Sequence, residues 1–340
     1  MIFPMDKPVI NPKYVSVSGY GYSGSGACVD LLKEFEGFGA LQGEFRIAKD
    51  PHGLCELEEL LVHNWDVIRH DIAIKDFLAY CEVLSRETGL FSRVGKNFSK
   101  NLSIDFMSES KSYIEKLTVM TYLGDTSLHR FYISAYKNFF MKMRSKFGKS
   151  IAKPMYFSRP SEVEFVRETK NYINRLFQSY MDLEKINTLV LDQAIPITNI
   201  VGASKYFESV KMIIVDRDPR DIYANMVRGK GLLAPELSNK DSATKYIQWH
   251  KQLRRISVRD SGTDIDKYVL RLSFEDLVFK YDNSVEKIIK FLGCDAQHNN
   301  KNKFFIPESS AKNIGLWKNY PDQSVMNRIG KELNSYCYVK

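Results

Sequence analysis

The feature that most constrains this chain is a glycine-rich turn between an alternating segment and an amphipathic one. Residues 15–18 read Val-Ser-Val-Ser, residues 19–26 contain four glycines, and apolar residues then recur at positions 28, 31, 32 and 35. The alternation predicts a strand, and the later spacing predicts a helix. Such a turn lets backbone N–H groups approach an anion at the N-terminal end of the helix. The sequence therefore predicts a phosphate or sulfate site here.

Three later apolar runs are typical of strands in a parallel sheet that is buried on both faces. They occupy residues 189–191, 212–215 and 269–270, and each is followed by polar or turn residues. Helical patterns lie between them, one of them opened by a capping box at Ser161 and Glu164. Strands that alternate with helices predict a doubly wound α/β fold.

The region from about residue 51 to 150 has a different pattern, with amphipathic helical segments and no buried strand. No low-complexity linker and no internal repeat divides the chain. We therefore expect a single domain over residues 1–340, with a helical insertion at residues 51–150.

Charge and composition narrow the classes of partner and the compartment. Forty-nine Lys and Arg against 41 Asp and Glu leave a net charge of +8, which favours nucleic acid, a membrane surface or a phosphorylated ligand. No apolar run is long enough for a membrane span, and residues 1–7 lack a signal-peptide pattern. The five cysteines and six histidines are dispersed, without metal-ligand spacing. These observations predict a cytoplasmic protein without a metal site.

The spacing of the glycines distinguishes between classes of nucleotide loop. Gly19 and Gly24 have the spacing that opens a P-loop, but Ser25 occupies the lysine position and Gly26 the Ser/Thr position. Both departures count against ATP hydrolysis. Gly21, Gly24 and Gly26 have the wrong order for a dinucleotide fingerprint. A glycine-rich turn without a ligand is the alternative.

Arg217 is the second candidate anion ligand. It directly follows the run at residues 212–215, at the carboxyl end of a predicted central strand, where open α/β sheets bind ligands. Its planar fork can hold a phosphate through two parallel hydrogen bonds. Pro219 is placed to begin a helix, and Asn225, two helical turns along, could add a donor. A surface cluster of Arg and Asp that caps the helix is the alternative.

Together these motifs resemble sulfotransferases that use 3′-phosphoadenosine 5′-phosphosulfate. Residues 22–26 are similar to the family's phosphosulfate loop, and residues 215–221 with Asn225 to its 3′-phosphate motif. Residues 271–277 resemble a late strand and turn of the family, and residues 312–318 the segment that closes over the nucleotide. The resemblance implies a P-loop-NTPase-like, three-layer α/β/α fold. It does not cover residues 51–150, where such families usually bind the acceptor.

The resemblance also implies the residues of the site. Residues 42–47 are similar to a Gly-Gly-Glu-x-Arg segment of tyrosylprotein sulfotransferases, which implies Glu44 as the general base with Arg46 beside it. A strand-end carboxylate paired with Arg46 is the alternative. The implied nucleotide ligands are Tyr22, Ser23, Gly24, Ser25, Gly26, Ala27, Cys28, Arg217, Asn225, Phe274, Lys312 and Trp317.

The chain departs from the family pattern at three places. Tyr22 occupies the position of a basic residue before Ser-Gly, so that a positive charge is missing, whereas Ser25 and Gly26 replace a pair of threonines and Asn225 replaces a serine. Arg46 or a lysine from elsewhere in the chain could supply the missing positive charge.

The resulting prediction is a cytoplasmic O-sulfotransferase that needs no metal, with a carbohydrate or glycolipid precursor as acceptor. Sulfation of protein tyrosine, a nucleotide-binding module that has lost its chemistry, and a P-loop kinase with Asp192 at a magnesium-binding strand end are the alternatives. Nucleic acid is disfavoured because no recognition motif is present. The basic stretch at residues 137–153 could bind acidic glycan, lipid headgroups or nucleic acid, or could be a solvated helix face.

Overall fold

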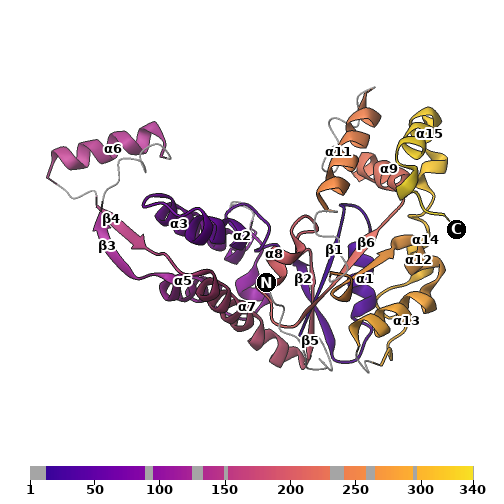
Figure 1. The fold of residues 1–340 in the computed structure, drawn as a ribbon, viewed down its shortest axis with the longest axis horizontal. Coiled ribbons are helices and arrows are strands. Elements are labelled where there is room, and N and C mark those ends of the chain that lie inside the picture. Colours follow the sequence, from indigo (N-terminus) through magenta and orange to yellow (C-terminus); the bar gives the residue numbers. More distant parts are fainter. Residues whose placement is uncertain are drawn as a thin grey trace. The chain divides into compact units, whose positions relative to one another are not determined.

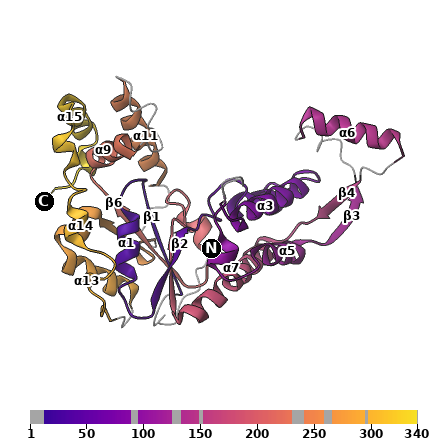
Figure 2. The same cartoon turned by 180° about the vertical axis from the view of Figure 1, so that it is seen from behind.

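The computed structural model describes residues 13–88, 95–124, 133–148, 152–229, 241–257, 265–293 and 297–339. The chain divides into two compact units, one made of Met1–Lys49 with Tyr180–Lys340 and the other of Asp50–Ser179 (Figures 1 and 2). The first seven residues and Cys294, which entered the prediction of compartment, lie outside the described residues.

The first unit is built on a five-stranded sheet in which all neighbouring strands are parallel, in the order β2-β5-β1-β6-β7. Its strands are β1 (Tyr14–Gly19), β2 (Phe38–Glu44), β5 (Thr188–Asp192), β6 (Val210–Asp216) and β7 (Val269–Ser273). The predicted α/β class with a central parallel sheet is confirmed, and every predicted apolar run is a strand of this sheet. Strand β2 was not predicted, because its sequence mixes glycine and polar residues and only Phe38 and Leu41 are buried.

Helices cover both faces of the sheet. Successive residues of a strand point to opposite faces, so neighbouring residues of β1 show what lies on each side. On one face, Val15 and Val17 of β1 share a core with α1 (Ser25–Leu32), α12 (Phe274–Phe279) and α13 (Tyr281–Leu292). On the other face, the Ser16 hydroxyl accepts from the Ile195 N–H at 3.1 Å, in the segment that leads into α8 (Ile200–Ser204). The unit is therefore three-layered.

A smaller apolar cluster holds the C-terminal part of the chain. It joins α9 (Pro219–Gly229), α11 (Ser242–Ser257), η5 (Leu316–Asn319) and α15 (Gln323–Glu332). The described part of the unit also contains the short elements η4 (Ile265–Lys267), α14 (Pro307–Ala311) and η6 (Asn334–Tyr336). Since α9 follows β6 directly, this cluster places the C-terminal segment beside the carboxyl ends of the strands.

The second unit is mainly helical, and its extent differs from that of the predicted helical insertion at residues 51–150. Its elements are α2 (Leu54–Glu58), η1 (Glu59–His63), α3 (Arg69–Ser85), α4 (Phe98–Asn101), α5 (Phe106–Leu117), β3 (Met120–Gly124), α6 (Ala135–Lys146), β4 (Lys153–Phe157) and most of α7 (Glu162–Glu184). The unit runs to Ser179 rather than to about residue 150, and β3 and β4 form an antiparallel pair within it. The predicted capping box is confirmed, because Glu164 N–H donates to the Ser161 hydroxyl at 3.3 Å and Ser161 N–H to the Glu164 carboxylate at 2.8 Å.

Across the described ranges, no helix is both long enough and apolar enough to span a membrane.

Candidate functional site

The loop after β1 adopts the conformation for which its glycines are needed. Gly21 and Gly24 have φ values of 79° and 90°, in the left-handed region that glycine tolerates best. A Cβ on Gly24 would also lie 2.4 Å from Cδ2 of Phe274, so no other residue fits there. A Cβ on Gly26 would meet nothing within 4 Å, so space is open beside this position.

The N-terminus of α1 is open to an anion. Gly24 is its N-cap residue and provides no side-chain cap, and the first turn holds no acidic residue. The first N–H groups of a helix have no partner within the helix, and they carry the positive end of its dipole. This end of α1 can therefore bind a phosphate or sulfate group, as the glycine pattern predicts.

Arg217 connects the loop to the C-terminal segment. One terminal nitrogen of its guanidinium donates to the Tyr22 carbonyl at 2.8 Å, and the other donates to the Asn313 carbonyl. Its Nε has no partner among the described residues, although the side chain is only 4% exposed. A guanidinium has five N–H donors, so Arg217 keeps donors for a ligand while it positions the two backbone segments. Burial lowers its pKa, and Asp221 and Glu275 oppose that shift.

Acidic side chains join the remaining motifs to the same strand end. Glu275, on α12, accepts from the Asp218 N–H at 2.9 Å. Asp221, on α9, accepts from the N–H groups of Gly315 and Trp317 at 2.8 and 3.1 Å. The four segments that carry the resemblance, far apart in sequence, thus meet at one edge of the sheet.

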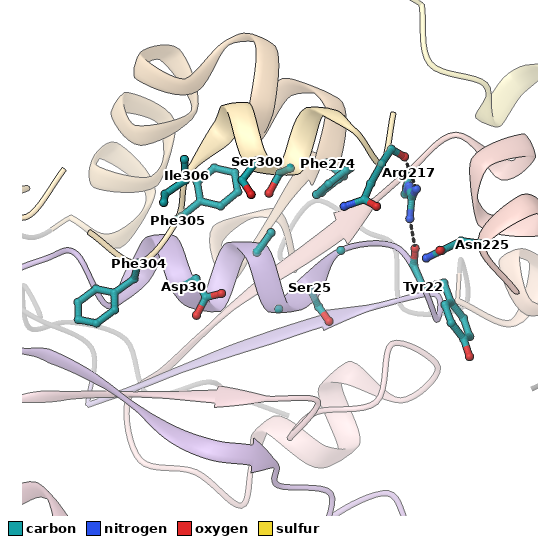
Figure 3. A pocket seen from close by; sticks show the side chains of 15 residues that line it. Tyr22, Ser25, Asp30, Arg217, Asn225, Phe274, Phe304, Phe305, Ile306 and Ser309 are labelled. Atoms are coloured by element: carbon teal, nitrogen blue, oxygen red, sulfur yellow. Dashed lines mark hydrogen bonds between the residues drawn. The ribbon is translucent and has the colours of Figure 1, made fainter. Parts of the chain in front are cut away.

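A pocket of about 540 Å³ lies between these segments (Figure 3). Arg217 and Asn225 lie toward one end, and three apolar residues from the 304–306 segment lie toward the other. Its lining residues are Tyr22, Gly24, Ser25, Gly26, Ala27, Asp30, Arg217, Asn225, Phe274, Phe304, Phe305, Ile306, Ser309, Ser310 and Asn313. Eight of the twelve predicted nucleotide ligands are among them. The pocket therefore combines anion donors at one end with an apolar surface at the other.

Four predicted ligands do not line the pocket. The Ser23 hydroxyl is turned inward and accepts from the Tyr20 N–H at 3.2 Å. Cys28 lies on the inward face of α1 within the sheet core, and burial raises the pKa of its thiol. Trp317 packs against the Arg220 guanidinium, 3.9 Å from its ring centroid. Lys312 follows α14 but is not among the lining residues, whereas its neighbour Asn313 is.

The sequence motifs did not point to several lining residues. Phe304, Phe305 and Ile306 supply the apolar end, but a run of three apolar residues before a proline is not distinctive. Ser309, Ser310 and Asp30 were missed as well. Arg228 carries a further positive charge at the rim, where it donates to the Asn225 side chain at 3.0 Å. The only sequence signal for Arg228 is its position three residues after Asn225.

A second polar cluster lies at the ends of β2 and β5. Glu44 is the register partner of Asp192, and Arg46 pairs with Glu44 at 3.3 Å. The Gln193 side chain donates to the Ser25 hydroxyl at 3.2 Å and accepts from the Lys49 ammonium at 2.8 Å. Burial, and to a lesser extent the Glu44 charge, raises the pKa of the Asp192 carboxyl to about 6. The register of Glu44 with Asp192 and the contact of Gln193 with Ser25 place Glu44 at the same sheet edge as the loop.

Metal ligation is possible in the other unit. Among the described residues, Glu58, His63 and Glu162 have ligand atoms within 4.8 Å of one another. They lie in the Asp50–Ser179 unit rather than among the pocket residues. That the pocket works without a metal stays a prediction.

We expect Glu275 to make the stability of the first unit depend on pH. Its side chain is 1% exposed, and burial raises its pKa from 4.5 to about 7, against the lowering effect of the hydrogen bond from the Asp218 N–H. A raised carboxyl pKa means that the folded state holds its proton more tightly than the unfolded chain, so stability is lost as the pH rises from about 4.5 to 7. Glu275→Gln keeps the acceptor for the Asp218 N–H without the charge. We expect it to raise the free energy of unfolding at pH 8 by up to about 3 kcal/mol, and to have no effect near pH 4.

Urea unfolding at pH 4, 6 and 8 measures this difference. Glu286→Gln, at an exposed position of α13, is the matched control and should leave the pH profile unchanged. A Glu275→Gln profile that is parallel to the wild-type profile at all three pH values would show that the buried charge is not the cause.

The chain was compared with family models, curated proteins and solved structures. No family model and no curated protein matches the chain. It is similar to the solved sulfotransferase domain of the Synechococcus PCC 7002 olefin synthase, with 14% identity, a TM-score of 0.44, and coverage of 97% of this chain and 96% of that chain. A sulfotransferase domain from the curacin biosynthetic pathway shows 12% identity and a TM-score of 0.44, over 95% and 98% of the two chains.

The sulfotransferase STF9 from Mycobacterium avium shows 10% identity and a TM-score of 0.37, over 97% of this chain and 78% of that chain.

Proposed function

We propose that this protein is a sulfotransferase that moves a sulfuryl group from 3′-phosphoadenosine 5′-phosphosulfate to an acceptor hydroxyl. The observation that carries the proposal is the position of Arg217, which lines the pocket, joins the loop at Tyr22 to Asn313 and keeps a buried Nε–H without a partner among the described residues. A ligand with anionic groups at two positions fits such a site. One group would lie at the N-terminus of α1, and the other at Arg217.

The donor fits the pocket in three parts. The backbone N–H groups at the start of α1 would bind the phosphosulfate. Arg217 and Asn225, with Arg228 at the rim, would bind the 3′-phosphate. The apolar faces of Phe274 and of the 304–306 segment would contact the adenine. The absence of a lysine in the loop, where Ser25 stands, favours this donor over ATP.

The donor supplies a sulfur centre with a phosphate leaving group, and the protein supplies positioning, charge stabilisation and a base. The acceptor oxygen forms a bond to sulfur while the bond from sulfur to the 5′-phosphate oxygen breaks, and 3′-phosphoadenosine 5′-phosphate leaves. Glu44 accepts the hydroxyl proton, and fixed donors in the loop stabilise the charge that accumulates on the leaving oxygen. A sulfuryl group carries less charge than a phosphoryl group, so this route needs no metal.

Lys49 is our candidate for the positive charge that Tyr22 does not supply. It reaches Ser25 of the loop through Gln193, by contacts of 2.8 and 3.2 Å. We expect Lys49→Met to lower the transfer rate about tenfold, because a charge that acts through a neighbour contributes less than a direct donor. The affinity for 3′-phosphoadenosine 5′-phosphate should change by less than about threefold, since that product lacks the sulfuryl group.

Single-turnover kinetics and calorimetry of Lys49→Met, Lys49→Arg and the exposed control Lys287→Met test this role. Lys49→Arg should recover most of the rate, because it restores the charge. Wild-type turnover in Lys49→Met would remove Lys49 from the account.

The acceptor is proposed to be a hydroxylated carbohydrate or glycolipid precursor. Protein tyrosine is the second acceptor class, supported by the sequence from Gly43 to Arg46. A cytoplasmic location is part of the proposal.

Incubation with the sulfate donor and a panel of glycans, glycolipids and tyrosine peptides, followed by mass spectrometry, tests the function. The expected result is a donor-dependent mass gain of one sulfuryl group on a glycan or glycolipid, lost in Arg217→Ala. A gain confined to tyrosine peptides would replace the acceptor class. Normal nucleotide binding without a gain on any acceptor would identify a binding module instead.

A further inference from the structure

Helix α6 (Ala135–Lys146) is the element whose side chains the fold leaves without a core. It has no buried residue, and both overall views show no other helix or strand packed against it (Figures 1 and 2). Its first turn is capped locally, since the Ser134 hydroxyl accepts from the Lys137 N–H at 3.4 Å. Most helices gain their stability from an apolar face buried against a neighbour. Among the described residues, α6 has no such buried face.

The apolar face of α6 is aromatic and continuous. Its exposed members are Tyr136 (72%), Phe139 (59%), Phe140 (46%), Met143 (38%) and Phe147 (75%). Spacings of three and four residues place them in one stripe along the helix. Three of them also contact one another, because the Phe140 ring lies 4.7 Å from Tyr136 and 6.0 Å from Phe139, centroid to centroid. Isolated exposed apolar residues are ordinary, but a contiguous stripe of this size marks an interaction surface.

Basic residues border the stripe on both sides. At 3.6 residues per turn, Lys137 and Arg144 lie along one border, and Lys142 and Lys146 along the other; all four are exposed. Residues 133–148 include no Asp or Glu. The surface is thus complementary to a partner that is apolar at its centre and anionic at its margin.

The strands that flank α6 in the chain extend this character. Val119 and Leu123 are 73% and 75% exposed, and Met120 of β3 is 55% exposed. Lys153, at the start of β4, is exposed too. Among the described residues of this unit, most of the exposed large apolar side chains lie at residues 119–123 and 136–147.

We propose that α6 binds the surface of a membrane that contains anionic lipids. The aromatic stripe would enter the boundary between headgroups and acyl chains, and the bordering lysines would extend to the lipid phosphates. A bilayer offers an apolar interior for the stripe and anionic headgroups for the basic borders, whereas nucleic acid would leave the continuous apolar stripe in water. The inference goes beyond the proposed reaction and does not depend on it, because binding is measured without donor or acceptor.

Co-sedimentation of the full-length protein with vesicles tests the proposal. Vesicles of phosphatidylcholine with 30% phosphatidylserine should sediment the protein, and vesicles of phosphatidylcholine alone should do so at least about tenfold less well. Binding to the mixed vesicles should weaken as salt is raised. Tryptophan fluorescence is not needed, because the sedimented fraction is read directly.

Two double variants separate the contribution of the aromatic stripe to vesicle binding from that of the basic borders. Phe139→Ser with Phe140→Ser removes the centre of the stripe, and Lys142→Ser with Lys146→Ser removes one basic border. Each double variant should weaken vesicle binding by about tenfold or more. The matched controls are Val163→Ser with Leu183→Ser, which are 76% and 66% exposed on α7, and Lys287→Ser with Lys290→Ser on α13. These controls should bind like the wild type.

Several results would overturn the proposal. The wild-type protein could stay in the supernatant with both kinds of vesicle, or the α6 variants could bind as well as the controls. If light scattering showed a dimer that Phe139→Ser with Phe140→Ser dissociates, and vesicles were not bound, the stripe would be an interface with a second copy. Retention on single-stranded RNA but not on vesicles would assign the surface to nucleic acid.

Discussion

Arg217→Ala should weaken the binding of 3′-phosphoadenosine 5′-phosphate by about 100-fold or more. A charge-assisted hydrogen bond contributes about 1.5 to 3 kcal/mol, and a guanidinium can make two to one phosphate. Arg217 is 4% exposed, with an unpartnered Nε, so its donors act where water competes little. Calorimetric titration measures the change in affinity. Arg217→Lys should recover only a small part of it, because an ammonium lacks the planar fork.

The same variant separates phosphate binding from the positioning of the backbone. Arg217 also donates to the carbonyls of Tyr22 and Asn313, so its loss could loosen the pocket for any nucleotide. Adenosine 5′-phosphosulfate lacks the 3′-phosphate, and its affinity should fall much less. Arg228→Ala removes an exposed arginine at the same end and should cost less than about tenfold. Equal weakening of both nucleotides by Arg217→Ala would assign Arg217 a purely structural role.

Glu44→Gln should lower the rate of sulfuryl transfer by about 100-fold to 10,000-fold while nucleotide affinity stays unchanged. The substitution keeps the shape of the side chain and removes its ability to accept a proton. Glu44 lies outside the nucleotide pocket, at the end of β2, so the affinity for the donor does not depend on it. Single-turnover rates with an acceptor found in the panel measure the effect.

Asp192→Asn is the substitution to compare with Glu44→Gln, because the two carboxylates are register partners at the same sheet edge. Burial raises the pKa of Asp192 to about 6, a value that also suits a base. If Asp192→Asn abolished transfer and Glu44→Gln did not, the base would be Asp192.

The sheet could be predicted from the sequence because its central strands are short apolar runs that end in polar residues. The same logic placed Arg217 and the glycine-rich loop at one edge, since parallel strands end on the same side of a sheet. Strand β2 lacked this signal, with two glycines and two buried residues among seven. Glu44 was found by similarity of a short segment rather than by a strand pattern.

The directions of individual side chains could not be predicted. Cys28 follows the loop in sequence, yet the rotation of α1 turns it into the core, and Ser23 is turned back to Tyr20. The 304–306 segment is held beside α1 by the Glu34 carboxylate, which accepts from the N–H groups of Phe304 and Phe305, and no local pattern encodes this contact. Contacts of this kind join segments distant in sequence, and only the fold brings them together.

The second unit shows how much of a structure can be predicted from amphipathic segments in the sequence. Helical periodicity predicted helices there, but it did not predict the β3–β4 pair or the continuation of the unit through α7. The basic and aromatic pattern of residues 137–153 was visible in the sequence. That no residue of α6 is buried is a result of the structure.

Calorimetric titration of the wild-type protein with 3′-phosphoadenosine 5′-phosphate and, separately, with ATP and magnesium distinguishes a sulfotransferase pocket from a kinase pocket. We expect micromolar or tighter binding of the bisphosphate, corresponding to about 8 kcal/mol or more, and binding of ATP with magnesium at least about tenfold weaker. Tighter binding of ATP with magnesium would rule out the proposed sulfotransferase and favour a kinase that uses Asp192.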